Sequence, residues 1–155
     1  MHVNWFFDLI TNPFLLTALS SWAIAQVLKV FINAYVNRTW DIERLFGDGG
    51  MPSGHSATVA SLAMFTGLRC GTGSFQFAMA AVLAIIVCHD ATGVRLETGK
   101  QAALLNAIVE SYNILVAKAL PEEKLKEFVG HTHSQVSAGM VIGILNALIM
   151  HYWVL

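Results

Sequence analysis

The sequence is poor in charged residues, and this lack narrows the protein class more than any motif does. Only 12% of its 155 residues are charged and 55% are hydrophobic, whereas soluble domains carry roughly 25% charged residues. A soluble protein of this size needs more charged residues on its surface, because small domains expose a large share of their residues. The composition therefore predicts a single membrane-embedded domain over residues 1–155.

Basic charge and cysteine are also scarce. Lys and Arg number 9 against 10 Asp and Glu, so the formal net charge is -1 and we expect no nucleic acid partner.

Cys70 and Cys88 both lie in apolar runs, and we interpret them as small buried hydrophobes rather than a disulfide framework. No basic segment precedes an apolar stretch at the N-terminus, so the first membrane helix is expected to serve as its own insertion signal.

Apolar runs are abundant. A helix that crosses a bilayer needs about 20 apolar residues. We predict four spans, at residues 13–36, 57–70, 75–92 and 136–155. The second is short, and the third contains the unbroken run FAMAAVLAIIVC. The predicted fold is an all-α integral membrane helical bundle of about four transmembrane helices.

A further helix is predicted at residues 101–120, followed by a short charged helix at 122–128. An apolar stripe runs along the longer of the two, with polar residues on another face. The stripe consists of Leu104, Ile108, Tyr112, Leu115 and Ala119. We interpret this helix as interfacial or peripheral. A fifth span is the alternative, and it would divide the polar motifs between the two membrane faces.

Four spans place most basic residues on one face of the membrane. That face carries Arg38, Arg44, Arg95, Lys100, Lys118, Lys124 and Lys126. The other face carries Arg69 alone. The positive-inside rule then predicts a multi-pass protein of the cell membrane whose basic face is cytoplasmic.

Three polar motifs fall on that same face. The first, GGMPSGHS at residues 49–56, combines glycines with Ser53 as a helix N-cap and His55 in the first turn, an arrangement that suits an anion. It is one residue from a nucleotide P-loop, but no strand precedes it. A glycine turn with an incidental histidine is the structural alternative.

The other two motifs carry a carboxylate and two more histidines. Asp90 ends an apolar span, and Arg95 is a plausible partner for it, either as a structural ion pair or within a functional site. In GHTHSQV, His131 and Gln135 are four residues apart and share a helix face. His131 and His133, with His55 or Asp90, could also form a metal site, although H-x-H alone is a weak signal.

In this order, GGMPSGHSA, DATGVR, G-K-QAALLN and GHTHSQV resemble the divergent phosphatidic acid phosphatase type 2 family, which is related to acid phosphatases and vanadium-dependent haloperoxidases. The resemblance covers nearly the whole chain. It implies a metal-independent histidine phosphatase with no cofactor. His131 would be the nucleophile and His55 the general acid, while Lys29, Ser53, Gly54 and, as the later arginine, Arg95 would hold phosphate.

Two departures from the wider superfamily bear on activity. Its first motif places an arginine seven residues after the lysine, where this chain has Val36, so that Arg38 or Arg44 would have to substitute. Its nucleophile is followed by an acid, where this chain has Gln135. In a serine-protease triad the comparable change costs roughly 10^4 in rate. Asp90 or Glu97 could supply the missing charge, and His133 is an alternative nucleophile.

The predicted function is hydrolysis of a phosphomonoester or pyrophosphate, lipid-linked because the site lies at the bilayer surface, through a phosphohistidine. The partners would be membrane lipid and this phosphorylated substrate. A catalytically impaired member that binds phosphate or lipid head groups is the alternative, and a transporter or channel component is a third. A homodimer is also considered. Gly139 and Gly143 offer a small-residue face, although packing within the chain is the favoured use of that face.

Overall fold

The computed structural model describes residues 4–38, 50–116, 124–125 and 130–154, and every regular element in these residues is a helix. The all-α prediction is therefore confirmed. In chain order the elements are α1 (Trp5–Ile10), α2 (Pro13–Asn37), α3 (Gly54–Cys70), α4 (Phe75–Thr92), α5 (Val94–Leu115), α6 (His133–Ile149) and a π-helix, η2 (Met150–Val154).

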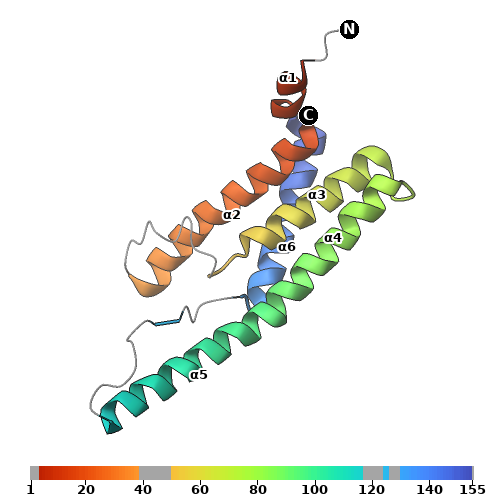
Figure 1. Cartoon of the computed structure of the whole chain (residues 1–155). Helices are drawn as coiled ribbons and strands as arrows, with labels where there is room; N and C mark the ends of the chain where they lie inside the picture. The colour runs from red at the N-terminus through yellow and green to blue at the C-terminus, as the bar shows by residue number, and fades with distance from the viewer. Residues whose placement is uncertain (1–3, 39–49, 117–123, 126–129, 155) are drawn as a thin grey trace.

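Helix α3 is the centre of the bundle. It packs against α2, α4 and α6, and α2 also contacts α6 (Figure 1). Small residues dominate the buried surface of α3, which includes Ser56, Ala57, Ala60 and Ser61. Because helix–helix association in lipid depends on close packing, a central helix made of small residues allows three neighbours to approach it.

The small-residue face of α6 is occupied within the chain. A Cβ atom at Gly139 would overlap the carbonyl oxygen of Ser53, and one at Gly143 would overlap that of Ala57. The two glycines therefore let the α6 and α3 backbones touch, as the sequence favoured. This face is not available to a second copy of the chain.

A buried polar contact joins α6 to α2. The Asn146 side-chain nitrogen donates to Ser21 Oγ at 2.7 Å and to Ser20 Oγ at 2.8 Å, and it lies 3.3 Å from the Thr17 carbonyl oxygen. An unsatisfied amide in hydrocarbon is costly, so these bonds favour one register between the two helices.

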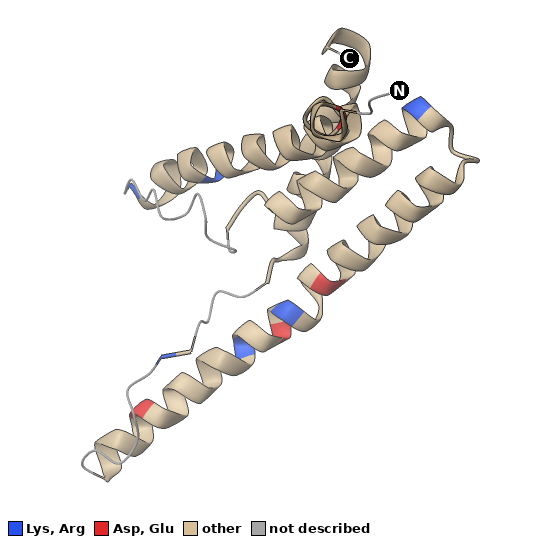
Figure 2. Cartoon of the chain, turned by 45° about the horizontal axis from the view of Figure 1, so that its top comes forward, with Lys and Arg blue, Asp and Glu red and all other residues tan. Residues whose placement is uncertain are grey.

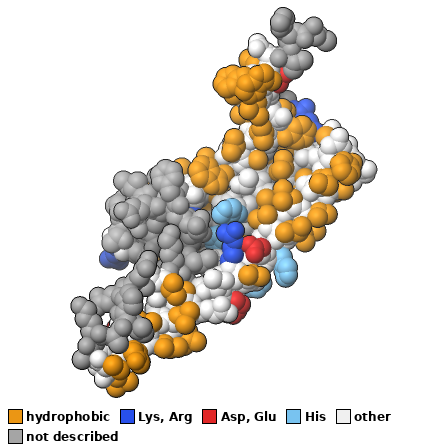
Figure 3. Space-filling model, in the orientation of Figure 1, with side chains coloured by type: hydrophobic (Ala, Val, Ile, Leu, Met, Phe, Trp, Pro, Cys, Tyr) orange, Lys and Arg blue, Asp and Glu red, His pale blue; other side chains and the backbone are white. Residues whose placement is uncertain are grey.

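Among the described residues, three helical segments are long and apolar enough to cross a membrane: Pro13–Asn37, Phe75–Leu115 and His133–Val154. Helix α3 has 17 residues, about 26 Å at 1.5 Å per residue, which is shorter than the roughly 30 Å of a bilayer core. These helices support a membrane-embedded fold, and the count of four spans stays a prediction. Hydrophobic side chains spread widely over the outer surface (Figure 3).

Helix α5 differs from the sequence prediction. It begins at Val94, not at residue 101, and runs in line with α4, so that the two form a 41-residue rod (Figure 1). Gly93 interrupts the helix without turning the chain. The short helix expected at 122–128 lies largely outside the described residues, and the two that are described, Lys124 and Leu125, are not helical. Helix α1 was not predicted.

Candidate functional site

The three polar motifs meet at the carboxyl end of α4, around a cavity of about 210 Å³. The lining residues are His55, Ile86, Val87, Asp90, Ala91, Arg95, Gly130 and His131. They come from the start of α3, the α4–α5 junction and the segment before α6. Figure 2 shows charged residues gathered around the α4–α5 junction, and Figure 3 shows basic, acidic and histidine side chains together near the middle of one face.

The first motif forms the capped start of α3. Ser53 is buried, and its Oγ accepts hydrogen bonds from the Ser56 amide at 3.3 Å and the Ser56 hydroxyl at 2.9 Å. Gly54 is buried at the α2 contact, where an added Cβ would lie 3.3 Å from the Trp22 ring. His55 is exposed and lines the cavity. The histidine thus lies in the first helical turn, where the helix dipole is positive.

The backbone of His131 is fixed to the end of α4. Its N–H donates to the Ala91 carbonyl oxygen at 2.9 Å. In an unbroken α-helix that carbonyl accepts from the amide four residues on, that of Arg95. Gly93, with φ -102° and ψ -101°, interrupts the helix between them. The break therefore gives His131 a backbone partner on α4.

Gly130 is required for this approach. Its φ is +93°, and a Cβ atom would overlap the backbone where Arg95 joins Leu96. Only glycine combines a left-handed backbone with so close a contact at little cost. No pattern in the sequence indicates a role for Gly93, Gly130 or the Ala91 carbonyl. Their only signal was the presence of glycine beside the motif histidine and within DATGVR.

The side chain of His131 is 4% exposed, and its ring orientation is set by Gln135. Gln135 Oε1 lies 3.2 Å from His131 Nδ1 and accepts from the Thr132 amide at 3.1 Å. Thr132 Oγ1 in turn accepts from the Gln135 amide, which completes a capping box at the start of α6. Because a backbone amide can only donate, the shared atom is the carbonyl oxygen, and Nδ1 must carry the proton. In the neutral imidazole, Nε2 is then the nitrogen with the lone pair.

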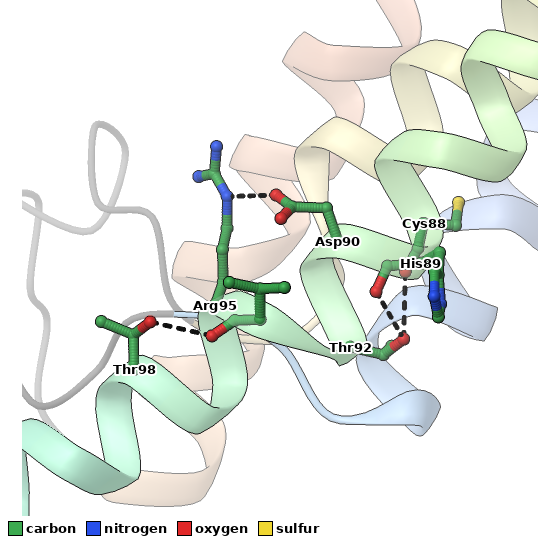
Figure 4. A network of polar contacts seen from close by, with 7 residues as sticks. Cys88, His89, Asp90, Thr92, Arg95 and Thr98 are labelled. Atoms are coloured by element: carbon green, nitrogen blue, oxygen red, sulfur yellow. Dashed lines mark hydrogen bonds and ion pairs between the residues drawn. The ribbon is translucent and has the colours of Figure 1, made fainter.

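Asp90 and Arg95 form an ion pair across the α4–α5 junction, with Arg95 Nε 2.7 Å from Asp90 Oδ2 (Figure 4). Their side chains are 42% and 52% exposed, respectively. Such exposed pairs contribute about 0–1 kcal/mol to stability. The two terminal guanidinium nitrogens point away from the carboxylate (Figure 4). Arg95 is therefore held at the cavity through its Nε, and its two terminal nitrogens are not used in the pair with Asp90.

Several predicted site residues do not line the cavity. Lys29 is 3% exposed within α2, and Arg38, with φ 55°, is the exposed C-cap of that helix. His133 is exposed, so His131 is the histidine of GHTH that faces the cavity. Arg44 lies outside the described residues. In the described part of the chain, no three His, Cys, Asp or Glu side chains form a group that could hold a metal ion, so the alternative metal site has no support there.

Comparison with known proteins identifies the family. A model described as the divergent PAP2 family matches residues 10–146, which include all three motifs. The chain is 40% identical over 155 residues to YuiD of Bacillus subtilis (strain 168), described as an uncharacterized membrane protein, with 94% of this chain and 98% of that protein covered. No solved structure matches the chain. This membrane-embedded helical protein belongs to the divergent PAP2 family.

Proposed function

We propose that the protein is a membrane-bound phosphatase that hydrolyses a lipid-linked phosphomonoester or pyrophosphate through a phosphohistidine. The observation that carries the proposal is that His55, Asp90, Arg95 and His131, from three separate segments, line one cavity. A cavity of about 210 Å³ exceeds the volume of several waters at about 30 Å³ each, so a phosphoryl group fits within it.

The proposed first step is attack by His131 Nε2 on phosphorus. The tautomer set by Gln135 suits this role, because Nδ1 keeps its proton while Nε2 forms the N–P bond. The P–O bond to the leaving group breaks as protonated His55 donates its proton to the departing oxygen. Water then attacks the phosphohistidine, which releases phosphate and restores the imidazole. His55 accepts the proton from that water.

Cationic groups would neutralise the phosphoryl oxygens in the transition state. Arg95 is the candidate at the cavity, with Asp90 as the carboxylate that positions it. Ser53 and Gly54 contribute the start of α3, whose amides and dipole favour an anion. Lys29 and Arg38 are proposed as further phosphate ligands from α2, and each would need to move toward the cavity to act.

A lipid-linked substrate is supported by the apolar side of the cavity. Ile86 and Val87 line it, and Ile86 is 59% exposed on α4, which has an apolar outer surface. A phosphate in the cavity can therefore remain attached to a chain that lies in hydrocarbon. We further propose that the cavity opens at the cytoplasmic face of the cell membrane, because most basic residues belong to that end of the bundle.

The test is release of inorganic phosphate by purified protein in lipid nanodiscs. Phosphatidate and an isoprenyl pyrophosphate serve as lipid substrates, and p-nitrophenyl phosphate serves as a soluble one. His131→Ala should abolish release, whereas His133→Ala, which alters an exposed neighbour outside the cavity, should retain it. Equal rates in both variants would reject the assignment.

Phosphate or head-group binding without turnover is the second candidate, favoured by one observation. Gln135 is neutral, so it orients His131 but adds no charge to stabilise an imidazolium. Vanadate, which adopts the geometry of phosphoryl transfer, should then bind saturably to wild type and not to His131→Ala, with no phosphate release from any substrate.

A further inference from the structure

We infer that α5 is a dimerisation arm, which pairs in parallel with α5 of a second copy of this chain. The rod formed by α4 and α5 has 41 residues, or about 61 Å, roughly twice the thickness of a bilayer core. Only one half of the rod can lie in hydrocarbon. The exposed charges of Asp90, Arg95, Glu97 and Lys100 mark where it leaves the membrane.

Beyond that charged band, α5 is largely without neighbours among the described helices. Within the described part of the chain, its only extended helix contact is with α4, at the junction. On one face Leu125 contacts the helix, because Asn106 accepts from the Leu125 amide at 3.0 Å and donates to the Leu125 carbonyl oxygen at 2.9 Å. The opposite face carries no such contact among the described residues.

That opposite face has the spacing of a coiled-coil seam. Leu105, Ile108, Tyr112 and Leu115 follow one another at intervals of three, four and three residues, and their exposed fractions are 49%, 53%, 45% and 82%. Apolar residues at this spacing form a narrow stripe that a second helix with the same stripe can cover. Leu104, at 62% exposed, borders the stripe.

The charge distribution along α5 favours a second copy of the chain, rather than the membrane surface, as the partner of this apolar stripe. From residue 101 to 115 the only charged residue is Glu110, which lies on the face opposite the seam. Helices that lie on membranes are typically rich in Lys and Arg on the polar face, and this segment has none. The seam itself is uncharged, so two copies meet there without repulsion. Both copies insert in the same orientation, which makes the pair parallel.

The straight course of α4 into α5 supports the same partner for the apolar stripe. A helix that lay on the membrane would turn sharply at Gly93, whereas α5 continues α4 in both views (Figures 1 and 2). The small-residue face of α6 is already covered by α3, so it does not compete as the contact between copies.

Cysteine crosslinking in native membranes tests the inference. In a background that carries Cys70→Ser and Cys88→Ser, Ile108→Cys should form a disulfide-linked dimer under oxidation, because disulfides need Cα atoms within about 7 Å. Glu110→Cys, one-half turn away on the opposite face, is the matched control and should stay monomeric. Equal crosslinking at both positions, or none at residue 108, overturns the inference.

A charge in the seam provides the second measurement. Ile108→Glu should convert the purified dimer to a monomer by light scattering, whereas Glu110→Ala should leave its mass unchanged. Circular dichroism establishes that both variants keep their helix content. A spin label at residue 108 that is accessible to lipid-dissolved oxygen, at the level seen for residue 85 on α4, would place α5 on the bilayer and overturn the inference.

Discussion

Gln135 Oε1 lies 3.2 Å from His131 Nδ1 and is held there by the Thr132 amide, so a neutral amide orients the imidazole at the position where the resemblance to the wider superfamily implies an acid. Orientation and charge stabilisation are separate contributions to catalysis, and only the first is available from an amide. This separation can be tested by restoring the acid.

Gln135→Glu should raise turnover. Glutamate can keep the capping box with Thr132 and adds a negative charge beside the imidazolium that forms during the reaction. We expect an increase of at least about tenfold, within the roughly 10^4 that the reverse change costs in a serine-protease triad. Phosphate release under saturating substrate measures it. Gln101→Glu, which adds the same charge on α5, should have no effect, and a lower rate in Gln135→Glu would contradict the prediction.

Gly130→Ala should destabilise the protein and impair the site. The substitution places a Cβ in a left-handed backbone, at about 1–2 kcal/mol, and also overlaps the α4–α5 junction. Gly71→Ala is the matched control, because Gly71 has φ +83° and nothing within 4 Å of an added Cβ. Gly130→Ala should lower the midpoint temperature of thermal unfolding more than Gly71→Ala does. Only Gly130→Ala should lose vanadate binding. Equal effects of the two changes would argue against a tight contact at Gly130.

Arg95→Ala should weaken vanadate binding with little effect on stability. A hydrogen bond to a charged group contributes about 1.5–3 kcal/mol, equivalent to roughly 10- to 150-fold in affinity. The half-exposed Asp90–Arg95 pair contributes at most about 1 kcal/mol to folding. Lys100→Ala removes the cation of the next ion pair along α5, to Glu97, and should leave vanadate affinity unchanged. Titration calorimetry compares the two variants, and similar losses would indicate a diffuse electrostatic effect.

Asn146→Leu should lower the stability of the bundle. It removes the hydrogen bonds to Ser20 and Ser21 between α6 and α2. Interhelical hydrogen bonds in membranes contribute about 0.6 kcal/mol on average, so the expected loss is about 1–2 kcal/mol. Unfolding in mixed micelles measures it, with Asn37→Leu at the exposed end of α2 as control. An unchanged unfolding free energy would show that the buried amide is not used for packing.

The sequence was sufficient for the all-α membrane fold, because apolar runs and scarce charge depend only on composition. It also indicated His55, Asp90, Arg95 and His131 as candidates, since each lies in a short polar motif between apolar helices, and the structure brings these four around one cavity. It did not place the start of α5, because charged residues after a glycine are equally typical of a loop. A glycine can break the hydrogen-bond ladder of a helix and still leave the helix axis straight. Residue types do not distinguish this case from a glycine that ends a helix in a loop, whereas the three-dimensional structure does.

The contact between His131 and Ala91 was not predictable for a similar reason. A backbone amide and a backbone carbonyl leave no trace in residue identity, so no pattern could indicate that they meet. The distinction between His131 and His133 likewise depends on where α6 begins. Because Thr132 is the N-cap, His131 precedes the helix and reaches the cavity, while His133 is its first residue and is exposed.

The break at Gly93 has a mechanical consequence. Helix α5, with 22 residues, is a lever about 33 Å long, and its fulcrum lies two residues from the carbonyl that holds His131. A small rotation of α5 about Gly93 would move its far end by several ångströms and the Ala91 carbonyl much less, so a load on the far end would act on the His131 anchor with mechanical advantage. The same glycine that gives His131 its backbone anchor therefore makes that anchor sensitive to any partner that binds α5.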